Sequence, residues 1–411
     1  MTVKKVSLRI TPDPSLHVAL ESKVPHIKIT QSEPFVVIGA ARIPTIATTS
    51  VQPDSSSCFG PRGGAVMKEG GPFWICDTGH HRLLGWQKQP KHDDTPADWV
   101  IGQPTMNHEG RNAKGKVTAF SLNVPTGICA YQWKNERAEK QTGMIVADAW
   151  NHRILVWKKL PQSNNVPADL VLGQLDFESG ESNQGRQTAD ATSMHWPYGV
   201  AWEDGHLIVA DAENRRLLIW KGMPTSNGQP ADTVLGQNNF ECRDENAGGV
   251  PNKMSMRWPH GLAYWKGYLC VSDAGNNRIM IWKGIPDQNG VDSDFLLGQK
   301  DEILVDHNQS LYWPRANTLN MPYGIASFKD WLIVADTANS RLLSWHIDDL
   351  KTNAHARGLC GQDNFHAKGD NRWLPAASDS FCWPYGIQIE NDILTVADSG
   401  NNRVSLWKLV P

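Results

Sequence analysis

The chain repeats one phrase six times: an Asp, an Arg five residues later, and a Trp four residues after the Arg. The instances are Asp77/Arg82/Trp86, Asp148/Arg153/Trp157, Asp211/Arg216/Trp220, Asp273/Arg278/Trp282, Asp336/Arg341/Trp345 and Asp398/Arg403/Trp407. After a first interval of 71 residues, the Asp residues lie 63, 62, 63 and 62 residues apart. A period this regular predicts an array of equivalent supersecondary units.

Each unit holds four short apolar runs separated by turn residues. In the third unit these runs cover residues 199–202, 207–210, 217–220 and 233–235. Runs rich in Val, Ile and Leu and bounded by Asp, Gly, Asn and Pro are typical of strands that are buried on both faces. Four strands in each of six units predict an all-β fold, a six-bladed β-propeller of four-stranded antiparallel blades.

The two ends of the repeat predict how the ring closes. The sixth unit reaches Pro411 after its third strand, and residues 34–39 match the fourth-strand phrase found at residues 99–102 and 170–173. We therefore expect the N-terminal strand to complete the last blade, which removes open sheet edges. The expected organisation is an N-terminal extension, residues 1–32, followed by a single propeller, residues 33–411.

These phrases resemble the NHL-repeat family of propellers. The resembling features are the Pro-x-Gly strand openers, the Val-Ala-Asp-x-x-Asn-x-Arg turn and the Leu-Gly-Gln fourth strand, and they extend over everything after about residue 33. The openers with a clear match are Pro125/Gly127, Pro197/Gly199, Pro259/Gly261, Pro322/Gly324 and Pro384/Gly386. The resemblance implies the fold, but that family includes RNA-binding and protein-binding scaffolds as well as lyases and hydrolases, so it implies no single activity.

Composition narrows the class of partner. With 40 basic and 43 acidic residues the net charge is −3, and no stripe of alternating Arg and aromatic residues occurs, so we expect no nucleic-acid partner. No segment approaches a membrane span, and we expect no membrane partner. The seven Cys residues are an odd number, and several fall inside predicted strands. Reduced thiols and a cytoplasmic protein are therefore expected.

The repeated residues are interpreted as structural. Each Asp is expected to cap the turn that follows it, and each Arg to pair with that Asp or with a neighbouring blade. A charged pair repeated six times around a ring cannot mark one active site. The third-strand Trp residues are expected to pack between blades.

Function is sought where the repeats disagree. The loops from each fourth strand to the next first strand run about twenty residues, which favours a functional role for the face on which they lie. Aligning the repeats on Pro-x-Gly gives two variable positions near the channel mouth on this long-loop face. Two places before the Pro stand Asn123, His195, Arg257, Asn320 and Cys382, with Cys58 or Phe59 in the first unit. One place after the Pro stand Arg62, Thr126, Tyr198, His260, Tyr323 and Tyr385.

These positions supply the candidate ligand-binding residues, which are Arg62, His195, Tyr198, Arg257, His260, Tyr323 and Tyr385. Neither set contains a carboxylate. A propeller hydrolase that holds calcium at its channel needs acidic oxygen ligands. The sequence therefore disfavours a calcium-dependent lactonase or esterase.

Two further clusters have alternative interpretations. Cys58 and Cys382 are aligned at equivalent positions of adjacent blades and, with His195, could bind a transition metal or a metal cluster; the alternative is two ordinary semi-buried thiols. In the turns of the first two units, His80 replaces an otherwise constant Asn and lies near His81, His152 and Trp150. We favour solvated turn residues over a ligand site there.

Two functions from different classes remain. The first is a binding or scaffold protein that presents a channel-mouth pocket to a small anionic or metal-containing ligand, or to a partner protein on the long-loop face. The second is a metal-assisted lyase or hydrolase with His195 or His260 as general base and Tyr198 or Tyr385 as acid. The missing ring carboxylates favour the first.

Overall fold

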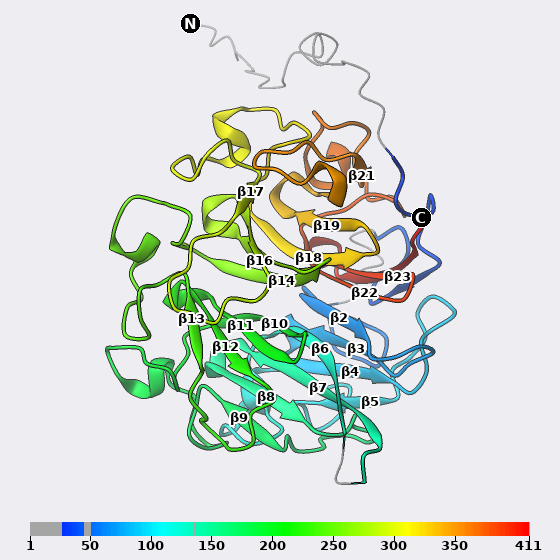
Figure 1. Cartoon of the computed structure of the whole chain (residues 1–411). Helices are drawn as coiled ribbons and strands as arrows, with labels where there is room; N and C mark the ends of the chain where they lie inside the picture. The colour runs from blue at the N-terminus through cyan, green and yellow to red at the C-terminus, as the bar shows by residue number, and fades with distance from the viewer. Residues whose placement is uncertain (1–26, 45–50, 135–136, 411) are drawn as a thin grey trace, which may run out of the picture.

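The chain forms six four-stranded antiparallel sheets arranged as blades around a central axis (Figure 1). A computed structural model describes residues 27–44, 51–134 and 137–410. The first strand of each blade lies toward the centre of the ring and the fourth toward the rim. The predicted six-bladed propeller is therefore confirmed.

The strands of the first three blades follow the order of the sequence. Blade one holds β2 (Gly63–Val66), β3 (Phe73–Asp77), β4 (Arg82–Trp86) and β5 (Trp99–Ile101). Blade two holds β6 (Pro125–Lys134), β7 (Lys140–Asp148), β8 (Arg153–Trp157) and β9 (Leu170–Leu172). Blade three holds β10 (Pro197–Glu203), β11 (His206–Asp211), β12 (Arg216–Lys221) and β13 (Thr233–Leu235).

The other three blades have the same plan. Blade four holds β14 (Pro259–Trp265), β15 (Tyr268–Asp273), β16 (Arg278–Lys283) and β17 (Phe295–Leu297). Blade five holds β18 (Pro322–Phe328), β19 (Trp331–Asp336), β20 (Arg341–His346) and β21 (Gly358–Cys360). Blade six holds β22 (Pro384–Glu390), β23 (Ile393–Asp398), β24 (Arg403–Lys408) and, as its outermost strand, β1 (Val36–Ile38).

Strand β1 closes the ring. It pairs antiparallel with β24, with Val36 opposite Leu406 and Ile38 opposite Val404, and its three residues are fully buried. The chain just before it also contacts the propeller, because Thr30 bridges Leu409 and Ile27 bridges Gly358 of blade five. The predicted closure is confirmed. The predicted boundary at residue 32 stays a prediction: residues 27–32 lie against blades five and six, and residues 1–26 lie outside the described residues.

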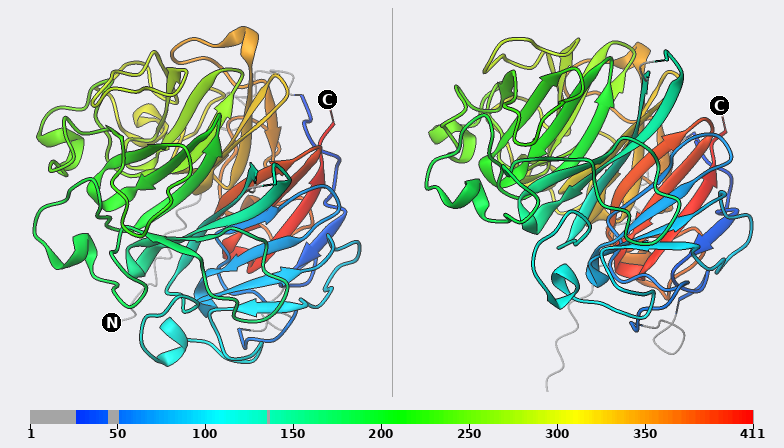
Figure 2. Two further views of the ribbon diagram at one scale, coloured as in Figure 1. Left: turned by 60° about the horizontal axis from the view of Figure 1, so that its bottom comes forward. Right: turned by 90° about the horizontal axis from the view of Figure 1, so that it is seen from below.

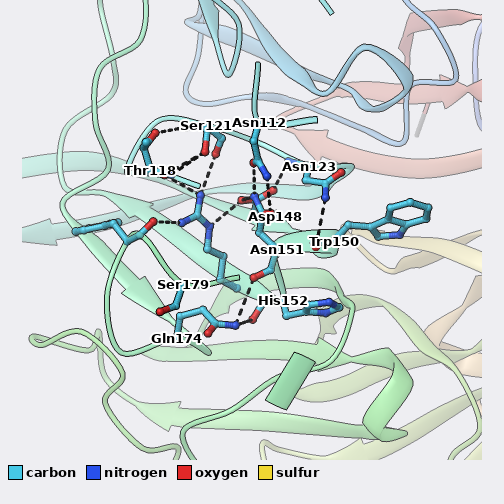
Figure 3. Close-up of polar contacts among 12 residues, drawn as sticks. Asn112, Thr118, Ser121, Asn123, Asp148, Trp150, Asn151, His152, Gln174 and Ser179 are labelled. Carbon is cyan, nitrogen blue, oxygen red and sulfur yellow. Dashed lines mark hydrogen bonds and ion pairs between the residues drawn. The ribbon is translucent and has the colours of Figure 1, made fainter. Parts of the chain in front are cut away.

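The repeated Asp and Arg form six buried ion pairs. Each Arg Nε donates to an Asp Oδ2 at 2.7 to 3.0 Å, and both side chains are almost wholly buried. In blade two the other Asp148 oxygen accepts from the Asn123 N–H, while Arg153 donates to the carbonyls of Thr118 and Ser121 in the preceding loop and of Phe177 in the following loop (Figure 3). Each Asp–Arg ion pair therefore links its blade to the long loop that precedes it and to the long loop that follows it.

Paired amides extend this network in five blades. Asn151 donates to Asp148 and exchanges hydrogen bonds with Asn112 of the preceding loop (Figure 3). In blade one, His80 takes the place of the Asn: its Nδ1 bonds Asp77 Oδ2 at 2.8 Å and its Nε2 bonds the Val51 carbonyl at 2.9 Å. The expectation of a solvated turn residue is wrong for His80, because the imidazole replaces the amide inside the buried network.

The core lies between blades. Neighbouring sheets lie face to face around the ring (Figure 2). Their apolar side chains pack together, and the six third-strand Trp residues are each at most 1% exposed. In blades one to five the indole N–H donates to a carbonyl nine residues further along the chain. This confirms the structural interpretation of the Trp residues. No helix in the described residues is long and apolar enough to cross a membrane.

Candidate functional site

The Pro-x-Gly openers bring the innermost strands into close contact around the axis. A Cβ built on any of the six glycines would overlap the backbone carbonyl oxygen of residue x in the next blade. The pairs are Gly63/Thr126, Gly127/Tyr198, Gly199/His260, Gly261/Tyr323, Gly324/Tyr385 and Gly386/Arg62. Only glycine, which has no side chain, fits at these positions, and the innermost strands therefore approach one another closely. As a result the six x side chains lie at one narrow level of the channel.

Five of these x side chains form a closed circle. The Arg62 guanidinium donates to the Tyr198 hydroxyl and lies 4.6 Å from the centre of the Tyr385 ring. The His260 ring lies 4.4 Å from both Tyr198 and Tyr323, and Tyr323 stacks on Tyr385 at 4.6 Å. The sixth position is the small Thr126, whose hydroxyl donates to the Tyr198 carbonyl. We call this arrangement the aromatic ring of the channel.

A cavity of about 320 Å³ extends from the aromatic ring along the channel. In each innermost strand its lining begins at residue x and continues toward the hairpin at the other end of the strand, and no residue of the long loops lines it. The sequence led us to expect the site at the channel mouth on the long-loop face. The observed cavity instead lies on the inner side of the aromatic ring, because the x side chains meet across the axis.

His260, one of the five residues that form the aromatic ring of the channel, is kept neutral by burial. Burial lowers its pKa to about 3, against the opposing effect of a hydrogen bond to the Trp258 carbonyl. The 2.9 Å contact between Nδ1 and that carbonyl places the proton on Nδ1, which leaves Nε2 as an acceptor. His260 is 7% exposed and lines the cavity, and within the described residues no hydrogen bond reaches its Nε2.

The charged residues of the cavity stand at opposite ends. Arg62 belongs to the aromatic ring, whereas Glu203 and Glu390 are the last residues of β10 and β22 and line the far end. Burial, and secondarily Asp204, raises the pKa of Glu203 to about 7. Burial, and secondarily Glu69, also raises the pKa of Glu390. The alignment that found no carboxylate at the two variable positions considered only the Pro end of the innermost strands, and these two acids lie at the other end.

The residues two places before the Pro do not join the cavity. Arg257 is paired with Glu245 at 3.1 Å, and its side chain is 44% exposed. His195 lies between blades two and three, with its ring 5.1 Å from that of His152. The structure thus brings together Arg62, Tyr198, His260, Tyr323 and Tyr385 and places the other two candidates elsewhere.

The predicted thiol pair rests on an incorrect alignment. The N–H that Asp77 accepts comes from Phe59, just as Asp398 accepts from Cys382, so Phe59 is the equivalent of Cys382. Cys58 instead packs with apolar residues between blades six and one, where burial raises its pKa well above the usual range. Burial, with Asp370 and Asp398 adding to it, raises the pKa of the Cys382 thiol to about 12.

No metal centre is apparent in the part of the chain that the structure describes. Within it, no group of three or more His, Cys, Asp or Glu side chains lies close enough to hold a metal ion. Cys58, Cys382 and His195 are accordingly not assembled into a ligand set.

The residue after each second-to-third-strand turn has a role that the sequence did not reveal. In all six blades it adopts a left-handed backbone conformation, and in five its side chain accepts a backbone N–H from the next blade. His81 and His152 serve in this way through Nδ1, receiving the N–H groups of Val124 and Trp196. These two His residues are therefore inter-blade contacts.

Comparison with known proteins returns likenesses of fold only. No protein-family model and no curated protein sequence matches the chain, so the NHL resemblance stays a prediction. Among solved structures, Chaetomium thermophilum Raptor is 9% identical with a TM-score of 0.46, and the match covers 98% of this chain but only 31% of Raptor. A gluconolactonase from Xanthomonas campestris is 12% identical with a TM-score of 0.46, covering 93% of this chain and 100% of the enzyme.

A third solved structure belongs to an enzyme of another reaction class. Virginiamycin B lyase from Staphylococcus aureus is 11% identical with a TM-score of 0.40, covering 87% of this chain and 98% of the lyase. The propeller thus has enzymes among its structural neighbours. Likeness at this level leaves the function to be argued from the site itself.

Proposed function

We propose that this propeller binds a small organic anion in its central channel, with Arg62 as the cationic anchor. The observation that carries the proposal is the state of Arg62. Its guanidinium lines the cavity, and within the described residues no carboxylate lies within ion-pair distance of it. A guanidinium in a partly enclosed site favours a bound carboxylate or phosphate, which it can hold through two parallel hydrogen bonds.

The neighbours of Arg62 support the same proposal. Tyr198 accepts one of its hydrogens and the Tyr385 ring lies against its face, so the guanidinium is oriented before any ligand arrives. A pre-oriented group loses little conformational freedom on binding, which favours affinity. The cavity volume of about 320 Å³ also falls at the small end of the range for ligand pockets.

A binding role is better supported than catalysis by His260. The alternative of a metal-assisted lyase or hydrolase needs a residue that takes a proton near neutral pH. With its pKa lowered to about 3, His260 is a weak base. His195, the other candidate base, does not line the cavity. A protein partner on the long-loop face stays a separate prediction, and the exposed Trp150, stacked on Trp196 at 5.5 Å, is the surface we would probe for it.

Calorimetric titration with hexanoate tests the proposal. Wild-type protein is compared with Arg62→Met, which keeps an apolar chain of similar length, and with Arg257→Met as a matched control outside the cavity. Loss of charge-assisted hydrogen bonds worth about 1.5–3 kcal/mol predicts a Kd for hexanoate roughly 10–100 times higher in Arg62→Met. The control should retain the wild-type Kd.

Two results would contradict the proposal. One is wild-type protein that takes up no hexanoate at millimolar concentration. The other is an Arg62→Met protein that folds and binds hexanoate as tightly as the wild type. Thermal unfolding of both variants separates a loss of binding from a loss of folding.

A further inference from the structure

The end of the cavity away from Arg62 carries two acids without partners. Glu203 and Glu390 end the innermost strands of blades three and six, which stand three positions apart in a ring of six and therefore on opposite sides of the channel. Each lines the cavity, and neither forms a hydrogen bond or ion pair with a side chain in the described residues. Lys266, in the corresponding turn of the neighbouring blade four, is paired with Asp330 at 2.8 Å.

An unpaired carboxylate buried in the cavity destabilises the folded protein. A carboxylate that is removed from water without a cation is destabilised, and its pKa rises in response. Glu203 shows this effect, with burial as the main cause. Burial also raises the pKa of Asp148, Asp336 and Asp398. These structural acids differ from Glu203 in their partners, because each of the six repeated Asp residues is paired with an Arg. The fold thus provides cations for its structural acids and none for the two in the cavity.

Branched aliphatic side chains and polar groups both line the stretch between the two charged ends, the polar ones including Ser327 and Gln388. Ile128, Val200, Leu262, Ile325 and Ile387 line it, together with alanines and glycines of the innermost strands. The cavity therefore presents a cation at one end, acids at the other, and between them a mixed wall in which aliphatic side chains from five blades could contact a hydrocarbon chain. The nine-tenths-buried His260, whose Nε2 lacks a donor, adds an unsatisfied acceptor near the Arg62 end.

We propose that the ligand of the channel is an elongated zwitterion, with its carboxylate at Arg62, an apolar chain along the walls and an ammonium group at the end of the cavity that Glu203 and Glu390 line. This inference rests on the proposed function, since it names the class of ligand for the same site. The zwitterion inference requires that the two charged groups of the ligand be far apart. Five residue steps of β10, from Tyr198 to Glu203, cover roughly 16 Å of strand, so an α-amino acid is too short to reach both ends.

Three probes test the two ends separately. Hexanoate carries only the anion, hexylammonium carries only the cation, and 8-aminooctanoate carries both at the ends of a longer chain. Each is titrated calorimetrically into the full-length protein in amine-free buffer. The proteins are wild type, Arg62→Met, the double variant Glu203→Gln/Glu390→Gln, and Glu241→Gln as an exposed control.

The expected pattern is specific. The double variant should bind hexylammonium roughly tenfold more weakly or worse, as expected for loss of charged hydrogen bonds, and should bind hexanoate as the wild type does. Arg62→Met should show the reverse. Wild-type protein should bind 8-aminooctanoate more tightly than either single-charge probe, and glycine, whose charges are adjacent, should not compete with it.

The failures of the two proposals can be told apart. Absence of hexylammonium binding, or equal hexylammonium affinity in wild type and the double variant, overturns the zwitterion inference even if hexanoate still depends on Arg62. Hexanoate binding with the same Kd in wild type and Arg62→Met overturns the proposed function. Should the double variant fail to fold, the single variant Glu203→Gln is titrated in its place, with the same outcomes expected.

Discussion

Replacing Glu203 with Gln should stabilise the ligand-free protein at pH 8 and leave its stability unchanged at pH 4.5. Burial raises the pKa of Glu203 from 4.5 to about 7 in the folded protein. The unfolded chain therefore releases this proton first as the pH rises, and the folded state retains it up to about pH 7. The free energy of unfolding accordingly falls between pH 4.5 and 7 and is level above that. Gln cannot ionise, so the variant escapes this loss.

The magnitude follows from the two pKa values. Each pKa unit corresponds to about 1.4 kcal/mol, so the full effect is on the order of 3 kcal/mol. The groups that face Glu203 are Asp204 on the adjoining turn, Cys129 of β6 and Tyr264 of β14. All of them remain in the variant, so their own titrations largely cancel in the difference between the two proteins.

Urea unfolding measures the difference directly. Wild type, Glu203→Gln and the exposed control Glu241→Gln are unfolded at pH 4.5 and pH 8 in amine-free buffers, because an amine could occupy the acidic end. The expected advantage of Glu203→Gln is about 3 kcal/mol at pH 8 and near zero at pH 4.5. An equal difference at both pH values would refute the reasoning, since it would mean that the carboxylate is not buried without a partner.

Other predictions concern the ring itself. Gly199→Ala should cost at least several kcal/mol in a urea titration, because its Cβ overlaps the His260 carbonyl, whereas Gly249→Ala, with open space around it, should be near neutral; equal effects would argue against the close contact of innermost strands. Asp211→Asn should lower the free energy of unfolding by about 3–5 kcal/mol, because it leaves Arg216 buried without its anion, and a loss below 1 kcal/mol would contradict a stabilising role of this ion pair. A chain that starts at Ala40 lacks β1 and should lose cooperative thermal unfolding; a cooperative, monomeric product would contradict closure by β1.

The sequence predicted the fold well because the repeat reports directly on equivalent units. The observed β10, β11, β12 and β13 contain the four runs expected for the third unit. The match of residues 34–39 to the fourth-strand phrase likewise placed β1 in the last blade. The period and the repeated phrases are local signals that occur in every blade, so the fold could be predicted without any knowledge of contacts between residues distant in the sequence.

The site was predicted only in part. The x positions were selected as variable residues, but their contacts around the axis join residues at least 62 apart in the sequence, for which the sequence has no local signal. The acids were missed because the alignment stopped near the Pro. Carried six residues beyond each Pro, it would have set Glu203 and Glu390 against the apolar Trp265 and Phe328, and that contrast was the available signal.

The thiol assignment was incorrect for a physical reason. An extra residue before Pro61 shifts the first unit by one position, and sequence alone could not decide which residue donates to Asp77. The backbone hydrogen bond decides it in favour of Phe59. Cys58 then falls at the position of Leu122, Met194 and Phe381, which are all core residues.

A crystal structure of the wild-type protein grown with 8-aminooctanoate tests the central claim most directly. We expect the ligand inside the channel, with its carboxylate on Arg62 and Tyr198 and its ammonium group at the end that Glu203 and Glu390 line. A ligand bound only on the long-loop face above the aromatic ring, with the channel filled by solvent alone, would contradict it.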